Sequence, residues 1–175
     1  ATNIRNYDGS YYFDLRTPEK IYYDICLNYG GVHNVENAVM AIAIALICGV
    51  SEQEMRKSIS SFSGVKRRFE VILKRKDFVY IDDYAHHPNE IKALVESLRI
   101  QYPTKKITAV FQPHLYTRTR DFADQFSKEL SGFDEIILLD IYPAREEPIA
   151  GINSKMLLHK INKMDKYYST KEGLL

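Results

Sequence analysis

The sequence predicts an α/β protein that contains an open, mainly parallel sheet. Two observations support this fold class. From about residue 65 onward, short apolar runs of strand type alternate with segments of helical periodicity. One of these runs, at 135–139, is apolar from its second residue onward, which is typical of strands that are buried on both faces of a parallel sheet. We therefore expect an open α/β sheet over residues 65–175, preceded by a distinct segment of strands and helices over residues 1–64.

The segment before residue 65 is expected to begin with strands and to continue with helices. Aromatic and β-branched residues between turn signals indicate short strands in the first 32 residues. A helix is predicted over Asn34–Cys48, and its nearly all-apolar faces suggest that it is deeply buried. Ser51 and Glu54 form a capping-box pattern that opens a second helix through about Ile59. The basic, glycine-containing stretch Phe62–Arg68 is interpreted as a boundary.

The segment after this boundary alternates strands and helices. Pro88 occupies the first helical position that proline favours. The expected order is a strand at Phe69–Lys74, a strand at Phe78–Asp82, a helix from Pro88 to about Tyr102, a strand at Lys106–Phe111, a helix at Arg118–Ser131, a strand at Glu135–Leu139, a loop at Tyr142–Gly151, a helix at Ser154–Ile161 and a strand-like pair at Tyr167–Tyr168.

Composition and charge exclude several classes of protein. The 175 residues carry 24 Lys and Arg against 23 Asp and Glu, a net charge of +1, which is too even for a sequence-independent nucleic-acid binder. The longest apolar run, 38–50, is shorter than the roughly 20 residues that a membrane helix needs. Cys26 and Cys48 lack metal or redox spacing and are interpreted as small buried hydrophobes. We expect a cytoplasmic protein without nucleic-acid or membrane partners, and its oligomeric state stays open.

Polar residues gather after three of the predicted strands, at 82–88, 112–120 and 142–147. In an open α/β sheet, ligands bind beyond the carboxyl ends of the strands. Acids, imidazoles and guanidinium groups that converge on one sheet edge suit an anionic substrate and proton transfer.

Each cluster also has a plain structural interpretation. Asp82 and Asp83 are equally well explained as the end of a strand and the cap of the next helix. Neighbouring histidines such as His86 and His87 do not converge on one zinc ion, so no metal site is expected. The 142–147 loop is a candidate for the edge of the site, although its charges also suit a loop ion pair of little energetic weight.

Three polar positions within predicted helices favour a ligand. Arg118 and Arg120 are expected in the first turn of a helix, where cations oppose the helix dipole, so an anionic ligand is the better explanation. Asn37 lies one turn into an apolar helix, and a buried amide needs a partner.

Four motifs resemble the Mur ligases of peptidoglycan synthesis: GVHNVENAVMAIAIA from Gly31, SGVKRRFE from Ser63, DDYAHHPNEI from Asp82 and FQPHLYTRTRDF from Phe111. Within that family they most resemble the ligases that join L-alanine to UDP-N-acetylmuramate. The murein-peptide recycling ligases of the same family are the alternative, but they diverge at PHLYTRTRD. The resemblance implies that residues 1–64 are the C-terminal part of a central ATP-binding domain. Residues 65–175 then form a Rossmann-like C-terminal domain that is truncated at its end.

The resemblance also implies roles for individual residues. The nucleotide contacts that it implies are His33, Asn34, Asn37, Arg68, Asp82 and Asp83. The substrate contacts that it implies are Tyr84, His86, His114, Arg118 and Arg120, and His86 and Arg118 are the catalytic candidates among them. Leu115 departs from members that carry arginine there, so anion binding falls more heavily on Arg118 and Arg120.

The implied reaction uses ATP and Mg²⁺ to activate the carboxylate of UDP-N-acetylmuramate as an acyl phosphate, which L-alanine then attacks. The 175 residues contain no GxxxxGK[ST] phosphate loop, and the magnesium ligands are expected elsewhere in the protein. We therefore expect a fragment that is inactive alone. A non-catalytic nucleotide-binding module is the competing hypothesis, and a metal-dependent hydrolase built on His86 and His87 is a third.

Overall fold

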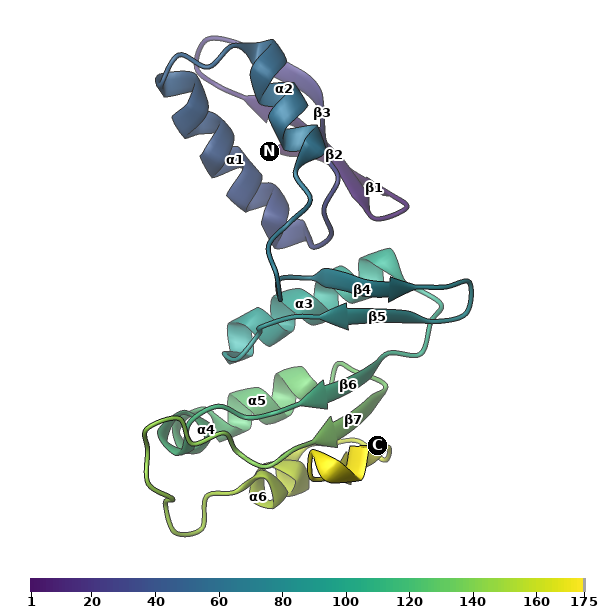
Figure 1. Cartoon of the computed structure of the whole chain (residues 1–175), viewed down its shortest axis with the longest axis vertical. Helices are drawn as coiled ribbons and strands as arrows, with labels where there is room; N and C mark the ends of the chain where they lie inside the picture. Colours follow the sequence, from purple (N-terminus) through teal and green to yellow (C-terminus); the bar gives the residue numbers. More distant parts are fainter. Residues whose placement is uncertain (175) are drawn as a thin grey trace. The chain divides into compact units, whose positions relative to one another are not determined.

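The computed structural model describes residues 1–174 and forms two compact units (Figure 1). The first unit contains Ala1–Tyr84 together with Ser97–Pro103. The second contains Ala85–Glu96 and the residues from Thr104 onward. Helix α3 (Pro88–Gln101) therefore contributes its beginning to the second unit and its end to the first.

The first unit is built on a three-stranded antiparallel sheet. Strands β1 (Thr2–Tyr7), β2 (Ser10–Arg16) and β3 (Ile21–Leu27) lie in that order, as expected for the first 32 residues. Asp8 and Gly9 connect β1 to β2 with φ angles of 48° and 90°. Two consecutive positive φ angles suit the twist of a two-residue hairpin, which explains the Asp-Gly pair at this turn.

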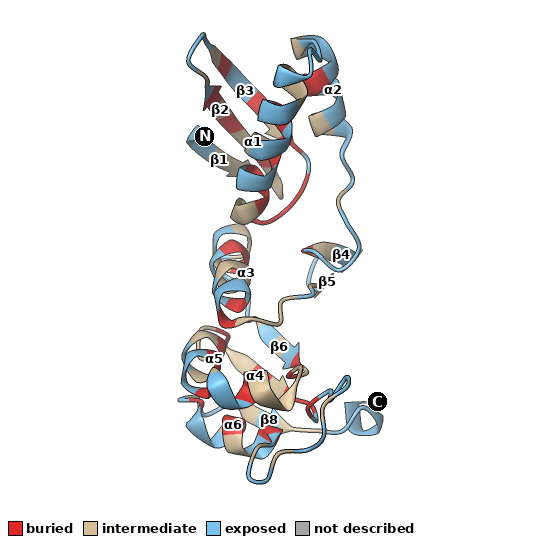
Figure 2. Ribbon diagram, turned by 90° about the vertical axis from the view of Figure 1, so that its left-hand side faces the viewer, coloured by how far each residue is buried: buried red, intermediate tan, exposed pale blue. Residues whose placement is uncertain are grey.

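Two helices pack on this sheet and close its core. Helix α1 (Val32–Ile47) and helix α2 (Glu52–Ser61) both contact the sheet, and both helices predicted from the sequence are confirmed. The capping box is also confirmed, because Ser51 and Glu54 exchange side-chain and backbone hydrogen bonds. Figure 2 shows buried residues on β2, β3, α1 and α2. The core consists of Tyr11, Phe13, Leu15, Tyr22, Ile25, Leu27, Tyr29, Val35, Ala38, Ile42 and Met55.

The expectation that α1 is buried on nearly all sides is wrong. Met40, Ile44 and Ile47 are 65%, 60% and 86% exposed, because among the described residues only one face of α1 meets other elements. Asn37 also lies on an exposed part of the helix, so the argument from a buried amide does not hold for it. Cys48, which follows α1 directly, is likewise exposed rather than buried, and Cys26 is half-buried.

Strands β4 (Glu70–Lys74) and β5 (Val79–Asp82) form an antiparallel hairpin in the first unit. We expected β5 to belong to the open parallel sheet, but among the described residues its ladder partner is β4. The short charged turn between the two strands brings them side by side in antiparallel pairing, which gives β5 its hydrogen bonds locally. Phe69, directly before β4, is 1% exposed and anchors the hairpin.

The second unit contains the parallel sheet that the sequence predicts. Strands β6 (Thr108–Phe111), β7 (Glu135–Leu138) and β8 (Lys166–Tyr168) lie in this order and are all parallel. Helices α4 (Tyr116–Asp121), α5 (Ala123–Leu130) and α6 (Ser154–Lys160) connect them, and a short 3₁₀ helix, η1 (Glu172–Leu174), follows. The α/β fold class is confirmed. The largest buried side chains are Phe126, Leu130, Ile136, Leu138, Leu157 and Ile161.

The helix predicted over Arg118–Ser131 is two helices. Helix α4 begins at Tyr116, and the backbone leaves helical geometry at Phe122 before α5 begins. Arg118 and Arg120 therefore lie in the last turn of α4, where a positive charge suits the helix dipole. The prediction that both occupy an unfavourable first turn is wrong, and other contacts must support an anion-binding role. No helix within residues 1–174 is long and apolar enough to cross a lipid bilayer.

Candidate functional site

Two of the three predicted polar clusters meet at the carboxyl ends of β6 and β7. His114 and Tyr142 form an isolated parallel bridge beyond the two strands. The Leu115 N–H donates to the Tyr142 carbonyl at 2.9 Å, and the Tyr142 N–H donates to the Pro113 carbonyl at 2.8 Å. Parallel strands end at the same edge of a sheet, so the side chains that follow them are brought together.

A cluster of imidazole and guanidinium groups occupies this edge. The His114 ring stacks on the Tyr142 ring with centroids 5.4 Å apart, and it meets the His86 ring edge-on at 6.1 Å. Arg118 Nη1 lies 3.4 Å from His114 Nδ1 and donates weakly to the His86 carbonyl at 3.5 Å. The structure thus brings His86, from the predicted cluster at 82–88, together with His114 and Arg118 from the cluster at 112–120.

The electrostatics of this cluster favour a neutral His114. Partial burial is the main cause that lowers the pKa of His114, and the nearby Arg118 and His86 add to it, while Glu146 acts in the opposite direction. A neutral imidazole can accept at Nδ1 from the guanidinium, which assigns the ring proton to Nε2. The guanidinium therefore carries the fixed positive charge of the cluster, and the lowered pKa of the His114 imidazole favours its neutral form.

His86 and His87 have different surroundings. Glu90, in the first turn of α3, accepts the N–H of His86 at 2.8 Å and that of His87 at 3.0 Å. Although partial burial acts to raise the pKa of Glu90, these backbone hydrogen bonds hold it below its ordinary value. The His87 ring packs on Phe122 with centroids 4.8 Å apart. Residues 1–174 contain no group of three or more histidine, cysteine or acidic side chains arranged to hold a metal ion.

In the first unit, the predicted nucleotide contacts begin at the N-terminus of α1. Asn34 is 6% exposed, donates to the Gly30 carbonyl at 2.6 Å and accepts from Asn37 Nδ2 at 3.1 Å. His33 Nδ1 is buried and has no hydrogen-bond partner within the described part of the chain. Burial is the main cause that lowers the pKa of His33, although Asp83 opposes it. An unpartnered imidazole nitrogen next to two amides suits the polar edge of a base.

The remaining predicted contacts of the first unit lie around the β4–β5 hairpin. Asp83 accepts the Phe69 N–H at 2.7 Å. Asp82 pairs with Arg67 Nε at 3.4 Å, and the Arg67 guanidinium lies over the Tyr84 ring, 4.8 Å from its centroid. Sequence reasoning selected Arg68 and missed Arg67, because three consecutive basic residues give no signal about which one turns toward the acids. Arg68 offers its carbonyl to the Tyr29 hydroxyl.

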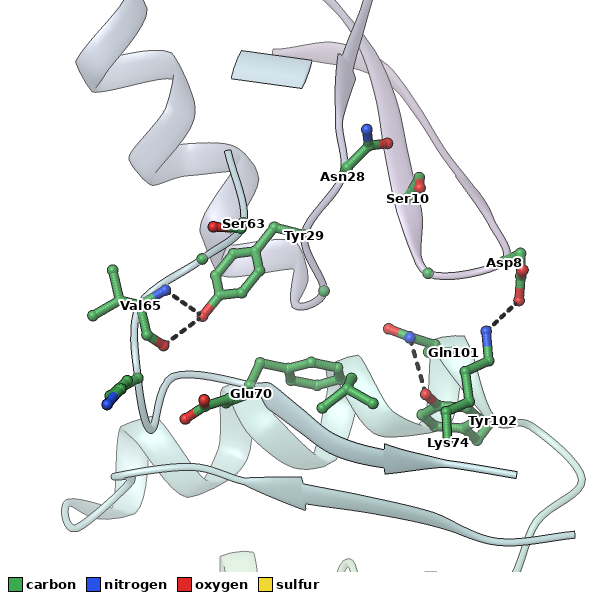
Figure 3. Close-up of a pocket in the computed structure, with 16 residues that line it drawn as sticks. Asp8, Ser10, Asn28, Tyr29, Ser63, Val65, Glu70, Lys74, Gln101 and Tyr102 are labelled. Carbon is green, nitrogen blue, oxygen red and sulfur yellow. Dashed lines mark hydrogen bonds and ion pairs between the residues drawn. The ribbon is translucent and has the colours of Figure 1, made fainter. Parts of the chain in front are cut away.

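A pocket of about 520 Å³ in the first unit does not coincide with these residues (Figure 3). Its walls include the Tyr29 ring and the ion pair of Lys74 with Asp8, whose charged atoms are 2.8 Å apart. None of the predicted nucleotide contacts is among its lining residues. The chemistry-bearing residues, rather than this cavity, therefore define the candidate site.

The family model for the Mur ligase glutamate ligase domain matches residues 67–173. The chain belongs to this family. A UDP-N-acetylmuramate–L-alanine ligase of Flavobacterium psychrophilum is 50% identical over 175 residues, which is all of this chain and 39% of the relative. A ligase of the same name in Christiangramia forsetii is 51% identical over 174 residues. The chain spans about two fifths of the length of these curated relatives.

Solved structures agree with this assignment. The UDP-N-acetylmuramate–alanine ligase of Thermotoga maritima superposes with a TM-score of 0.77 at 27% identity, covering 94% of this chain and 35% of that one. A folylpolyglutamate synthase of Mycobacterium tuberculosis, complexed with ADP, has a TM-score of 0.74 at 16% identity, with 98% and 38% covered, and shows the fold alone. The predicted Mur ligase family membership is confirmed.

For this Mur ligase chain, the roles predicted for single residues and the domain boundary at 64/65 stay predictions. Sequence reasoning treated Glu146 only as part of a loop at the edge of the site. In the structure Glu146 accepts from the Thr117 N–H at 2.9 Å and also from the Thr117 hydroxyl. Thr117 is adjacent to Arg118, so Glu146 reaches the cluster through it. No local sequence pattern indicates a contact between positions 29 residues apart.

Proposed function

We propose that this chain is part of an ATP-dependent ligase that joins L-alanine to UDP-N-acetylmuramate through an acyl phosphate. The carrying observation is the identity of about 50% along the whole chain to ligases of that name. The cluster of His86, His114 and Arg118 supports it, because it supplies a fixed positive charge beside groups that can exchange protons.

The residues of the first unit fit an adenine nucleotide. The unpartnered His33 Nδ1 and the neighbouring amides of Asn34 and Asn37 present donors and acceptors of the kind that a base edge requires. ATP supplies the phosphoryl group that activates the carboxylate. Within residues 1–174 no three acidic, histidine or cysteine side chains are grouped to hold a metal ion. We propose that the Mg²⁺ ligands lie elsewhere in the protein.

In the proposed reaction, the second unit handles charge and protons. Arg118 stabilises the negative charge that develops on phosphoryl and carbonyl oxygens, which fixed donors do most effectively when they are positioned beforehand. The attacking amine must be neutral, so the His86 imidazole orients it and accepts a proton. Positioning of the reactants supplies the rest of the acceleration.

A chimera tests the proposal. The homologous segment of the Flavobacterium psychrophilum ligase is replaced by residues 1–175, and phosphate release is measured with ATP, UDP-N-acetylmuramate and L-alanine. We expect activity from the chimera and none from the 175 residues alone. Arg118→Ala should lower kcat/KM by about 100-fold, a typical loss for one charge-stabilising donor. Lys160→Gln, which removes only a surface ion pair with Asp124, should leave it unchanged.

Two outcomes would overturn the proposal. A folded chimera that is inactive with L-alanine but accepts an L-alanyl peptide would identify the recycling ligase instead. A folded chimera that binds ATP but releases no phosphate with either acceptor would favour a nucleotide-binding module without catalysis.

A further inference from the structure

The loop that follows β7 holds the segment that carries His114 and Arg118. Backbone hydrogen bonds link Tyr142 with Pro113 and Leu115, and the Tyr142 ring stacks on His114. These contacts come from a part of the chain that is remote in sequence. The geometry of the cluster therefore depends on the loop as well as on α4.

Glu146 supplies the cap that α4 lacks. The residue before α4 is Leu115, whose side chain cannot accept a hydrogen bond, and the first turn of α4 contains no acidic residue. Glu146 Oε2 accepts the Thr117 N–H at 2.9 Å, and Oε1 accepts the Thr117 hydroxyl. These hydrogen bonds, with help from the charge of Arg118, hold the pKa of Glu146 below its ordinary value. A carboxylate from another element thus performs the role that an N-cap side chain usually has.

The backbone before α4 needs this support. Leu115 has a φ angle of 72°, in the left-handed region that bulky residues avoid. Its N–H is fixed by the Tyr142 carbonyl at 2.9 Å. Its carbonyl accepts the N–H and the hydroxyl of Thr119 at 3.1 and 2.8 Å. An unfavourable conformation persists only where its surroundings determine it, and here the loop and the buried Thr119 do so from two sides.

We propose that Glu146 is a positioning residue, which fixes the first turn of α4 through Thr117 and so holds the Arg118 guanidinium at His114 Nδ1. Glu146 itself need not touch a substrate. The catalytic consequence rests on the proposed function, whereas the structural consequence does not. The two can therefore be tested separately.

The structural test uses the 175-residue chain and NMR. In Glu146→Ala the Thr117 amide loses its acceptor, so its hydrogen exchange should quicken about fivefold, as for a lost helix cap. Arg118 then leaves His114. The lost Glu146 charge alone would lower the pKa of His114, but Arg118 lowers it by more than Glu146 raises it, so the pKa rises toward its ordinary value. In Glu146→Gln the amide oxygen still accepts from Thr117 while the negative charge is lost, so the pKa of His114 falls. Opposite signs in the two variants are the signature of positioning.

Equal downward shifts in both variants, with unchanged exchange at Thr117, would show that Glu146 acts only as a charge and would overturn the proposal. Glu147→Gln, in the same loop and exposed, is the control for a general effect of loop charge. If it reproduces the Glu146→Ala result, the contact with Thr117 is not responsible.

The catalytic test uses the chimera. Glu146→Ala should lower kcat about tenfold and leave the KM for ATP within about twofold, because a misplaced charge affects the transition state rather than nucleotide binding. Glu146→Gln should recover most of the activity. If the unsubstituted chimera is inactive, the proposed function fails while the NMR result stands. If the chimera is active and Glu146→Ala matches it, the positioning role fails.

Discussion

The polar residues at the start of α1 and those at the ends of β6 and β7 are used in different ways. In the first unit, the side chains hydrogen-bond to the backbone: Asn34 donates to the Gly30 carbonyl, and Asp83 accepts the Phe69 N–H. In the second unit, the Arg118 guanidinium lies against the His114 imidazole. Candidate site residues such as Asn34 therefore also stabilise the fold of the first unit. Arg118, in contrast, sets the electrostatic environment of the His114 imidazole.

The largest effect is expected from Asn34→Ala. The Gly30 carbonyl would stay buried without its donor, so the free energy of unfolding of the first unit should fall by about 2 kcal/mol. Asn37→Ala is the matched control, because Asn37 is exposed, and its effect should stay below about 0.5 kcal/mol. Urea unfolding followed by NMR signals of each unit separates the two parts of the chain. Equal losses from both variants would contradict the comparison.

A smaller effect is expected from Arg118→Gln, which changes a proton equilibrium rather than a backbone contact. Arg118 is one of the causes that lower the pKa of His114, so its loss should raise that pKa. The pKa of His33 is lowered by burial in the first unit and should not respond. Titration of the histidine ring signals by NMR measures both. A His33 shift as large as that of His114 would remove the distinction.

The lowered pKa of His114 also determines how the stability of the second unit changes with pH. A histidine whose folded pKa lies below its ordinary value of 6.5 stabilises the fold above that value, and this contribution is lost as the pH falls. Arg118→Gln should therefore reduce the loss of stability of the second unit between pH 7 and pH 5.

The smallest effect is expected from Arg120→Gln. Arg120 pairs with its neighbour Asp121 on the surface, at 2.7 Å, and exposed pairs of this kind add little to stability. The unfolding midpoint and the pKa of His114 should both stay unchanged. A shift of the His114 signal would instead place Arg120 in the cluster.

Much of the fold could be predicted from local patterns. The capping box at Ser51, the proline at the start of α3 and the apolar run of β7 each act through neighbouring residues, and each was located from the sequence. The burial of α1 could not be predicted in this way. An apolar helix shows that burial is favourable, but which face is covered depends on the elements that pack against it.

The candidate site divides along the same line. The clusters after β6 and β7 were found because the ends of parallel strands share one edge. The break at Phe122 was missed, since Phe122 fits the apolar stripe of a single helix. The position of Arg118 in α4 was missed for the same reason. Glu146 was missed because its partner is set by the tertiary fold.

The hydroxyl of Tyr29 affects how readily the chain is cleaved by proteases. It accepts the Val65 N–H at 3.3 Å and lies within hydrogen-bonding reach of the Arg68 carbonyl, on either side of the basic pair Lys66 and Arg67. A run of basic residues is an inviting target for trypsin-like proteases, which need several residues of unfolded backbone to cut. Since Tyr29 is 8% exposed and packed in the core, proteolysis at this run is governed by the free energy of local opening. One aromatic hydroxyl thus ties down the backbone on both sides of this basic pair.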